Sequence, residues 1–213
     1  MEKEFELKCS FCGVKACNTE EEKQPPEFCP TPVNDDIMEE AVHAYLEDKE
    51  VRTIALEAAR TESEGYCKWT RVEETVNFAK RMGFRNIGIA HCVGLIKEAQ
   101  VVHKILESNG FKVNSVCCKA GRIDKEKIGF TDSEKVYPGK FETACNPVAQ
   151  AKILEKAGCD FNIVIGLCIG HDSLFFMHSK VPTTVLIVKD RVLGHNPVAA
   201  LYTSQTYYKH LIK

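Results

Sequence analysis

The sequence lacks several features that would each mark a particular class of protein. No apolar run approaches the roughly 20 residues that a membrane span needs, and residues 1–5 contain no apolar segment of the kind found in signal peptides. The 28 lysines and arginines and the 30 aspartates and glutamates give a formal net charge of −2, so the chain has no strong basic excess for nucleic acid. The pattern G-x-G-x-x-G is also missing after the first expected strand, which argues against a dinucleotide site. We therefore expect a cytoplasmic protein with neither membrane nor nucleic-acid partners.

Cysteine, by contrast, is abundant, with eleven copies in 213 residues. Disulfides are disfavoured in the cytosol, so these residues are expected to be thiols, thiolates or metal ligands. The odd total also fits poorly with a complete disulfide framework. Eight of the eleven fall into two groups, one in a short N-terminal leader and one spread along the rest of the chain.

The leader, residues 1–33, has no apolar period and is rich in proline. Such a segment cannot build a core alone and needs a staple. The spacing C-x2-C-x4-C-x11-C, closed by a proline, supplies four thiolates, which suit tetrahedral zinc or a [4Fe–4S] cluster equally well. The alternative is a flexible tail with four unligated thiols. The expected metal ligands are Cys9, Cys12, Cys17 and Cys29.

The remainder, residues 34–213, is predicted to be an α/β domain with leading helices. Apolar periodicity predicts helices over about 34–48, 50–62 and 70–83, the last begun by a capping box of Thr70 and Glu73. Strands then alternate with helices: strands near 87–90, 112–118, 161–167 and 183–188, and helices near 95–109, 146–158 and 172–178. This order predicts a Rossmann-like parallel sheet with helices on both faces. The segment 119–143, with one helical turn near 124–128, is long enough to be functional.

A second group of cysteines lies where these strands end or where the next helix begins. Because the carboxyl ends of parallel strands meet at one edge and bind ligands there, we expect this group to converge. Side chains alternate along a strand, so only one of Cys117 and Cys118 can face the site, and Cys118 is preferred. Helix N-termini favour thiolates and anionic ligands there. The alternative is that these are small buried hydrophobic residues. The expected cofactor-binding residues, with [4Fe–4S] as the candidate cofactor, are Cys92, Cys118, Cys145 and Cys168.

Other polar residues flank this second group and are candidates for catalysis. His171 follows Cys168 and serves either as a ligand or proton donor or as a helix cap. The loop after the last strand carries two cations and a histidine that could bind an anion, or that form a solvated charged turn. The candidate catalytic residues are Cys145, Cys168, His171, Lys189, Arg191 and His195.

Three blocks and the leader together resemble a known family. The blocks are residues 144–151 (ACNPVAQA), 166–175 (GLCIGHDSLF) and 188–197 (VKDRVLGHNP). With the four leader cysteines, they resemble a bacterial and archaeal family of metal-binding proteins of unknown function. The resemblance covers nearly the whole chain and implies that the leader cysteines bind zinc. It supplies no substrate.

Three functions remain open at this stage. The first is a metalloenzyme whose strand-end cluster acts on a small or sulfur-containing molecule by sulfur transfer, desulfuration or redox chemistry. The second is a non-enzymatic protein for metal storage, delivery or sensing. The third is a thiol enzyme with Cys145 or Cys168 as nucleophile and zinc only in the leader.

Overall fold

The computed structural model describes residues 6–212. Within these residues the chain forms two compact units, which divide between residues 60 and 61. The sequence-based division at residue 33 stays a prediction.

The first unit contains short 3-10 turns and the leading helices. The turns cover Cys9–Phe11, Ala16–Asn18 and Thr31–Val33. Helix α1 follows as Asp35–Glu47, and α2 spans Lys49–Gly65, so that its last residues belong to the second unit. The predicted N-terminal helices are therefore confirmed. Asn34 precedes α1, but its side-chain amide donates to the carbonyl of Pro30 instead of capping the helix.

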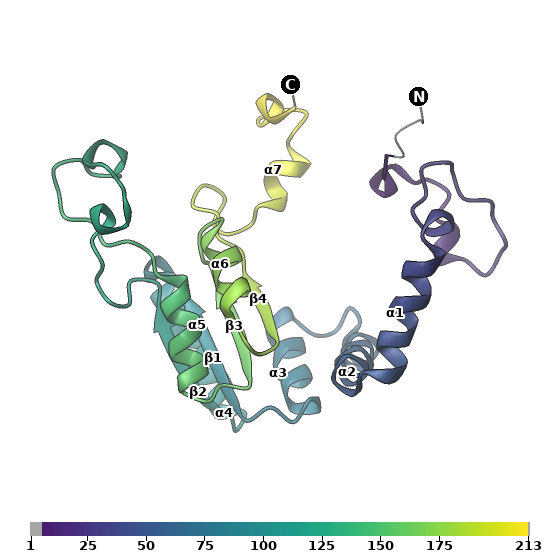
Figure 1. Cartoon of the computed structure of the whole chain (residues 1–213), viewed down its shortest axis with the longest axis horizontal. Helices are drawn as coiled ribbons and strands as arrows, with labels where there is room; N and C mark the ends of the chain where they lie inside the picture. The colour runs from purple at the N-terminus through teal and green to yellow at the C-terminus, as the bar shows by residue number, and fades with distance from the viewer. Residues whose placement is uncertain (1–5, 213) are drawn as a thin grey trace. The chain divides into compact units, whose positions relative to one another are not determined.

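The second unit is built on a four-stranded, all-parallel sheet (Figure 1). The strands are β1 (Asn86–His91), β2 (Lys112–Cys117), β3 (Phe161–Ile165) and β4 (Thr183–Ile187). Their order is β2-β1-β3-β4. The chain leaves β1 toward β2 and later returns to β1's other side with β3, so the direction of winding reverses between β1 and β3. In open parallel sheets such a reversal is where ligands bind.

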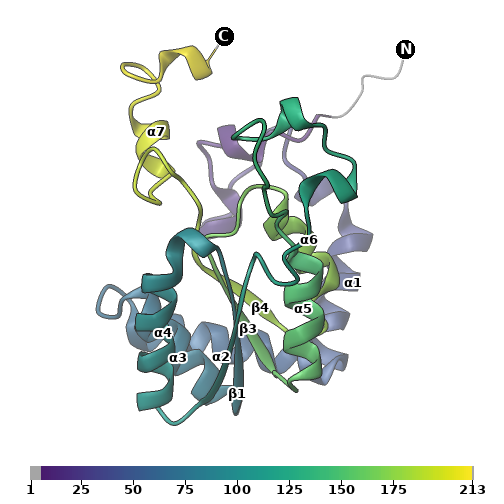
Figure 2. The ribbon, with the colours of Figure 1, turned by 90° about the vertical axis from the view of Figure 1, so that its left-hand side faces the viewer.

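Helices cover both faces of this sheet, which confirms the predicted fold class. Figure 2 shows α4 (Ile96–Ser108) and α5 (Pro147–Lys156) on opposite sides of the strands. The other helices are α3 (Arg71–Arg81), α6 (His171–His178) and α7 (Val198–Tyr202), and a last 3-10 turn covers Lys209–Leu211. The predicted capping box at the start of α3 is present. The sequence patterns did not predict α7.

The core lies where the central strands β1 and β3 meet the helices. All five residues of β3 are buried, as are the last five of β1. Continuous apolar runs are expected for strands covered on both faces. The edge strand β2 is only partly buried. The buried strands β1 and β3 therefore lead directly into the segments that carry Cys92 and Cys168.

Residues 119–143, called the long loop below, are held together by contacts within the loop. The loop contains the predicted turn, Lys125–Ile128, and a second one, Asp132–Glu134. A bridge between Asp124 and Thr143 closes it. The buried ammonium of Lys135 binds Glu126 and Asp132. Figure 2 shows the loop at the end of the unit to which the strands point.

Candidate cysteine site at the strand ends

Backbone hydrogen bonds between neighbouring strands continue for one residue past the ends of β1 and β2. They align the chain segments that carry Cys92 and Cys118. The N–H of Cys92 donates to Ile165 O at 3.1 Å, and the N–H of Cys118 donates to His91 O at 2.8 Å. The N–H of Asn146 then donates to Cys118 O at 2.8 Å. The segments that carry Cys92, Cys118 and Cys145 are thus fixed side by side at one edge.

The thiol of Cys118 is the shared partner of the thiols of Cys92 and Cys145, and we call these three residues the cysteine trio. Cys118 lies between the other two and hydrogen-bonds to both. It is 2% exposed and also accepts the N–H of Val93 at 3.3 Å. The sulfur of Cys92 accepts the N–H of Gly94 at 3.4 Å. Three thiols from three chain segments therefore share one small volume.

Basic side chains surround the trio. Lys189 Nζ donates to the sulfur of Cys92 at 3.3 Å, and Lys119 Nζ donates to the sulfur of Cys145 at 3.5 Å. Both lysines are half-buried. Each outer thiol of the trio thus has its own ammonium group, which favours the thiolate form.

The pKa values of the outer thiols reflect these neighbours. The pKa of Cys92 falls to about 4, chiefly because the Cys118 thiol donates to it; the Gly94 N–H and Lys189 lower it further, while burial opposes the change. The same neighbour, Cys118, is the main cause that lowers the pKa of Cys145 to about 5. The largest cause of both pKa shifts is therefore the hydrogen bond with Cys118, a contact that the sequence could not show.

The central thiol behaves in the opposite way. The pKa of Cys118 is raised, because the sulfurs of Cys145 and Cys92 are alternative acceptors for its single proton and so favour the protonated form, and because the thiol is buried. These neighbours favour the protonated form of the central thiol and the thiolate form of the outer two. Such a donor set is soft and anionic, which suits thiophilic metals.

Cys168 is held separately at the same edge of the sheet. Its sulfur accepts a hydrogen bond from Arg191 at 2.9 Å, and its carbonyl accepts the N–H groups of His171 and Asp172 at the start of α6. The charge of a protonated His171 would act on Cys145. The Nδ1 atom of His171 is buried and finds no partner within residues 6–212. The structure thus brings Cys168 and His171 to the edge without joining Cys168 to the trio's hydrogen bonds.

The remaining candidates are placed as follows. His195 is tied into its own loop, where its Nδ1 accepts the backbone N–H of Asp190 at 3.1 Å. Cys117 packs against the core beside Cys118, Cys159 is buried, and Cys67 is exposed. None of these three cysteines takes part in the trio.

The four leader cysteines line a single cavity in the first unit. It has a volume of about 260 Å³, and its walls include Cys9, Cys12, Cys17 and Cys29. The N–H of Lys15 donates to the sulfur of Cys12 at 3.4 Å. Convergence of four thiols on one space is what the spacing predicts, although binding of a metal there stays a prediction.

Neither cysteine group forms a finished coordination shell. Across residues 6–212, no three His, Cys, Asp or Glu side chains are arranged to hold a metal ion. In the trio, the Cys118 thiol hydrogen-bonds to the other two sulfurs instead. Metal binding requires that the thiol protons leave, because thiolates are the ligands.

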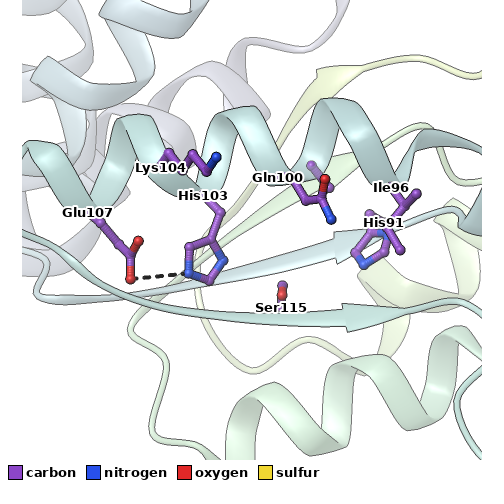
Figure 3. A pocket seen from close by; sticks show the side chains of 8 residues that line it. His91, Ile96, Gln100, His103, Lys104, Glu107 and Ser115 are labelled. Atoms are coloured by element: carbon purple, nitrogen blue, oxygen red, sulfur yellow. Dashed lines mark ion pairs between the residues drawn. The ribbon is translucent and has the colours of Figure 1, made fainter.

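A groove with several polar residues in its lining lies on the α4 side of the sheet, next to β1 (Figure 3). It begins at His91, the residue before Cys92, and runs along α4 to Glu107, beside Ser115 of β2. His103 in its wall pairs with Glu107 at 3.4 Å. The groove has a volume of about 480 Å³ and no cysteine in its lining.

Two residues of the site were missed by the sequence patterns. Lys119 follows Cys118 directly and could have been suspected from that position alone. Gln150 lies on the buried face of α5, where it is 0% exposed. The available signal was a polar residue at a core position of the helix.

Fold and site together define a parallel α/β protein with a cysteine cluster at the carboxyl ends of its strands. Residues 29–186 match the family model described as "Protein of unknown function (DUF1847)". Because this match covers most of the chain, the protein belongs to that family. The matched region includes Cys29 and all four strand-end cysteines, whereas Cys9, Cys12 and Cys17 lie before it.

A relative and a solved structure complete the comparison. Uncharacterized protein MJ0455 of Methanocaldococcus jannaschii is 44% identical over 207 residues, which cover 97% of this chain and 99% of the relative. The crystal structure of Dph2 from Pyrococcus horikoshii with a 4Fe-4S cluster is 21% identical, with a TM-score of 0.34. That match covers 67% of this chain and only 33% of the other. A likeness this remote carries no conclusion about a cofactor or a reaction. Separately, no helix within residues 6–212 is long and apolar enough to cross a membrane.

Proposed function

We propose that the cysteine trio holds a thiolate-ligated metal centre, an iron–sulfur cluster, and that the protein uses it in sulfur transfer, desulfuration or small redox chemistry. The observation that carries the proposal is that Cys118 hydrogen-bonds to thiols from two other chain segments, each of which has a lysine on its sulfur. The donor set fits such a centre, because thiolates are the ligands of iron–sulfur clusters and the lysines balance their negative charge.

Three protein ligands matter for the chemistry. A [4Fe–4S] cluster held by three thiolates would supply one iron with a free position, where it acts as a Lewis acid or accepts sulfur. The protein's own residues do the rest. Arg191 is exposed and can bind an anionic substrate beside Cys168. The unpaired Nδ1 of His171 can hold or release a proton there. A small, anionic, sulfur-containing molecule is therefore the proposed substrate class.

The leader is proposed to hold a second metal, zinc or an iron–sulfur cluster, with a structural or electron-transfer role. The shared cavity of its four cysteines supports this. A segment that begins with short turns and has no buried residues in them gains most from a metal staple.

The test is purification without oxygen, followed by iron, zinc and acid-labile sulfide analysis. Cys118→Ala should lose about four irons and four sulfides relative to wild type, as one [4Fe–4S] centre requires. Cys117→Ala is the matched control and should retain them. The double variant Cys9→Ser/Cys12→Ser should lose only the leader metal. A folded wild-type protein without iron, or equal losses in the two alanine variants, would contradict the proposal.

One observation favours a second candidate, a thiol enzyme. Cys145 is half-buried, its pKa is lowered to about 5, and Lys119 lies beside it. A thiolate of this kind can act as a nucleophile. In that case alkylation of Cys145 should abolish turnover of a substrate while the metal content stays unchanged. If neither turnover nor alkylation sensitivity is found but metal binds tightly, the function is storage, delivery or sensing.

A further inference from the structure

Gln150 is a polar side chain in a place where packing alone calls for an apolar one. It lies on the face of α5 that also carries the buried residues Pro147, Ala151 and Leu154. It is 0% exposed, and its Oε1 atom has no hydrogen-bond partner in the described part of the chain. A buried acceptor without a partner lowers stability relative to an apolar residue of similar size. The reason for an amide at this position must therefore lie in the contacts of its nitrogen, Nε2.

The nitrogen of the Gln150 side chain binds two carbonyls on two different strands. It donates to Val116 O at 2.7 Å and to His91 O at 3.2 Å. His91 is the last residue of β1 and precedes Cys92, and Val116 lies two residues before Cys118. The side-chain amide of Gln150 thus donates to both β1 and β2 close to the points where these strands lead to Cys92 and Cys118.

The third thiol lies just before the helix that carries Gln150. Cys145 immediately precedes Asn146, the residue that caps α5 by accepting the N–H of Ala149 at 3.0 Å. The backbone N–H of Gln150 donates to Asn146 O at 3.1 Å. Gln150 therefore joins the start of α5, through its backbone, to the ends of β1 and β2, through its side chain. These are the three places in the fold next to which the trio lies.

We infer that Gln150 is the positioning residue that sets the spacing of Cys92, Cys118 and Cys145. The inference rests on the proposed function in one respect only: the spacing serves a metal centre. Residues behind metal ligands are known to matter in this way, and their loss typically costs about 10–100-fold in metal affinity. Gln150→Met keeps the length and the helix propensity of the side chain but removes both donors.

The experiment uses the full-length, metal-free protein in two titrations. The first is Co²⁺, followed by thiolate-to-cobalt absorption, in the Cys9→Ser/Cys12→Ser background so that the leader does not contribute. The second is phenylarsine oxide, which bridges neighbouring thiols, measured by intact mass. Gln150→Met should bind Co²⁺ about 10–100-fold more weakly than its parent, and its thiols should be bridged more slowly.

The matched control is Leu154→Ala. Leu154 is fully buried on the same helix, one turn further along and away from the strand ends. This variant should unfold at a lower temperature but keep the Co²⁺ affinity and the bridging rate of the parent. Unchanged Co²⁺ affinity and bridging in Gln150→Met would overturn the inference. Equal losses in Leu154→Ala would also overturn it, because they would show that lower stability is sufficient.

Two further outcomes remain decisive. If Gln150→Met does not fold, Gln150→Asn replaces it, since this side chain keeps the amide but is one methylene too short to span both carbonyls. If the parent binds no Co²⁺, the proposed metal centre fails, whereas the phenylarsine oxide comparison still decides whether Gln150 positions the thiols.

Discussion

Gly166 provides a sharp test of how the strand ends are packed. It follows β3, begins the turn that presents Cys168, and has a φ of +61°. A Cβ at this position would lie 2.9 Å from both methyl carbons of Leu95. Leu95 is 0% exposed and is the last residue of the 3-10 turn Val93–Leu95, which joins Cys92 to α4. This contact therefore packs the Cys92 segment against the Cys168 segment.

The expected cost of Gly166→Ala has two parts. A left-handed backbone costs a non-glycine residue about 1–2 kcal/mol. Overpacking of a buried contact adds about 1–3 kcal/mol, because Leu95 is fully buried. Gly83→Ala separates the two parts, since Gly83, which follows α3, has a φ of +74° but nothing within 4 Å of its Cβ position. That control should lose only the backbone part.

The assay is urea unfolding followed by fluorescence of Trp69, which is the single tryptophan of the chain and lies in the second unit. The free energy of unfolding should fall further in Gly166→Ala than in Gly83→Ala. In the Leu95→Ala background, the cost of Gly166→Ala should drop to about that of Gly83→Ala, because the clash is gone. An equal cost of Gly166→Ala in the wild-type and Leu95→Ala backgrounds would refute the reasoning.

Three other predictions concern the long loop and α3. Lys135→Met should raise amide hydrogen exchange throughout the long loop, because the buried ammonium that binds two carboxylates is lost; the exposed Lys127→Met is the control and should not. Hydrogen bonds from lysines hold the pKa values of Asp132 and Glu142 below their ordinary range. Their stabilisation is therefore present at neutral pH and lost as the pH falls below about 4, so loop protection that persists unchanged at pH 3 would contradict these contacts. Thr70→Ala should lower the free energy of unfolding by about 1 kcal/mol through loss of the α3 cap, as measured in urea; no change would mean that the cap is dispensable.

The local sequence determined the elements and the general location of the site. Apolar periodicity fixes the helices and strands to within a few residues, because burial on one face imposes the period of the element. Alternation of strands and helices implies a parallel sheet, whose carboxyl ends must share an edge. This was enough to expect Cys92, Cys118, Cys145 and Cys168 at that edge, and to prefer Cys118 to Cys117.

Only the tertiary structure decided which of those groups touch. The order β2-β1-β3-β4 places the ends of β1 and β2 beside the start of α5, so three thiols meet while Cys168 pairs with Arg191. The partner lysines and the Gln150 amide come from positions 26 to 97 residues away from the groups they bind. No local period encodes such contacts, because they depend on how whole elements pack. The abundance of cysteine suggests a metal, and the packing decides which of the strand-end thiols lie together.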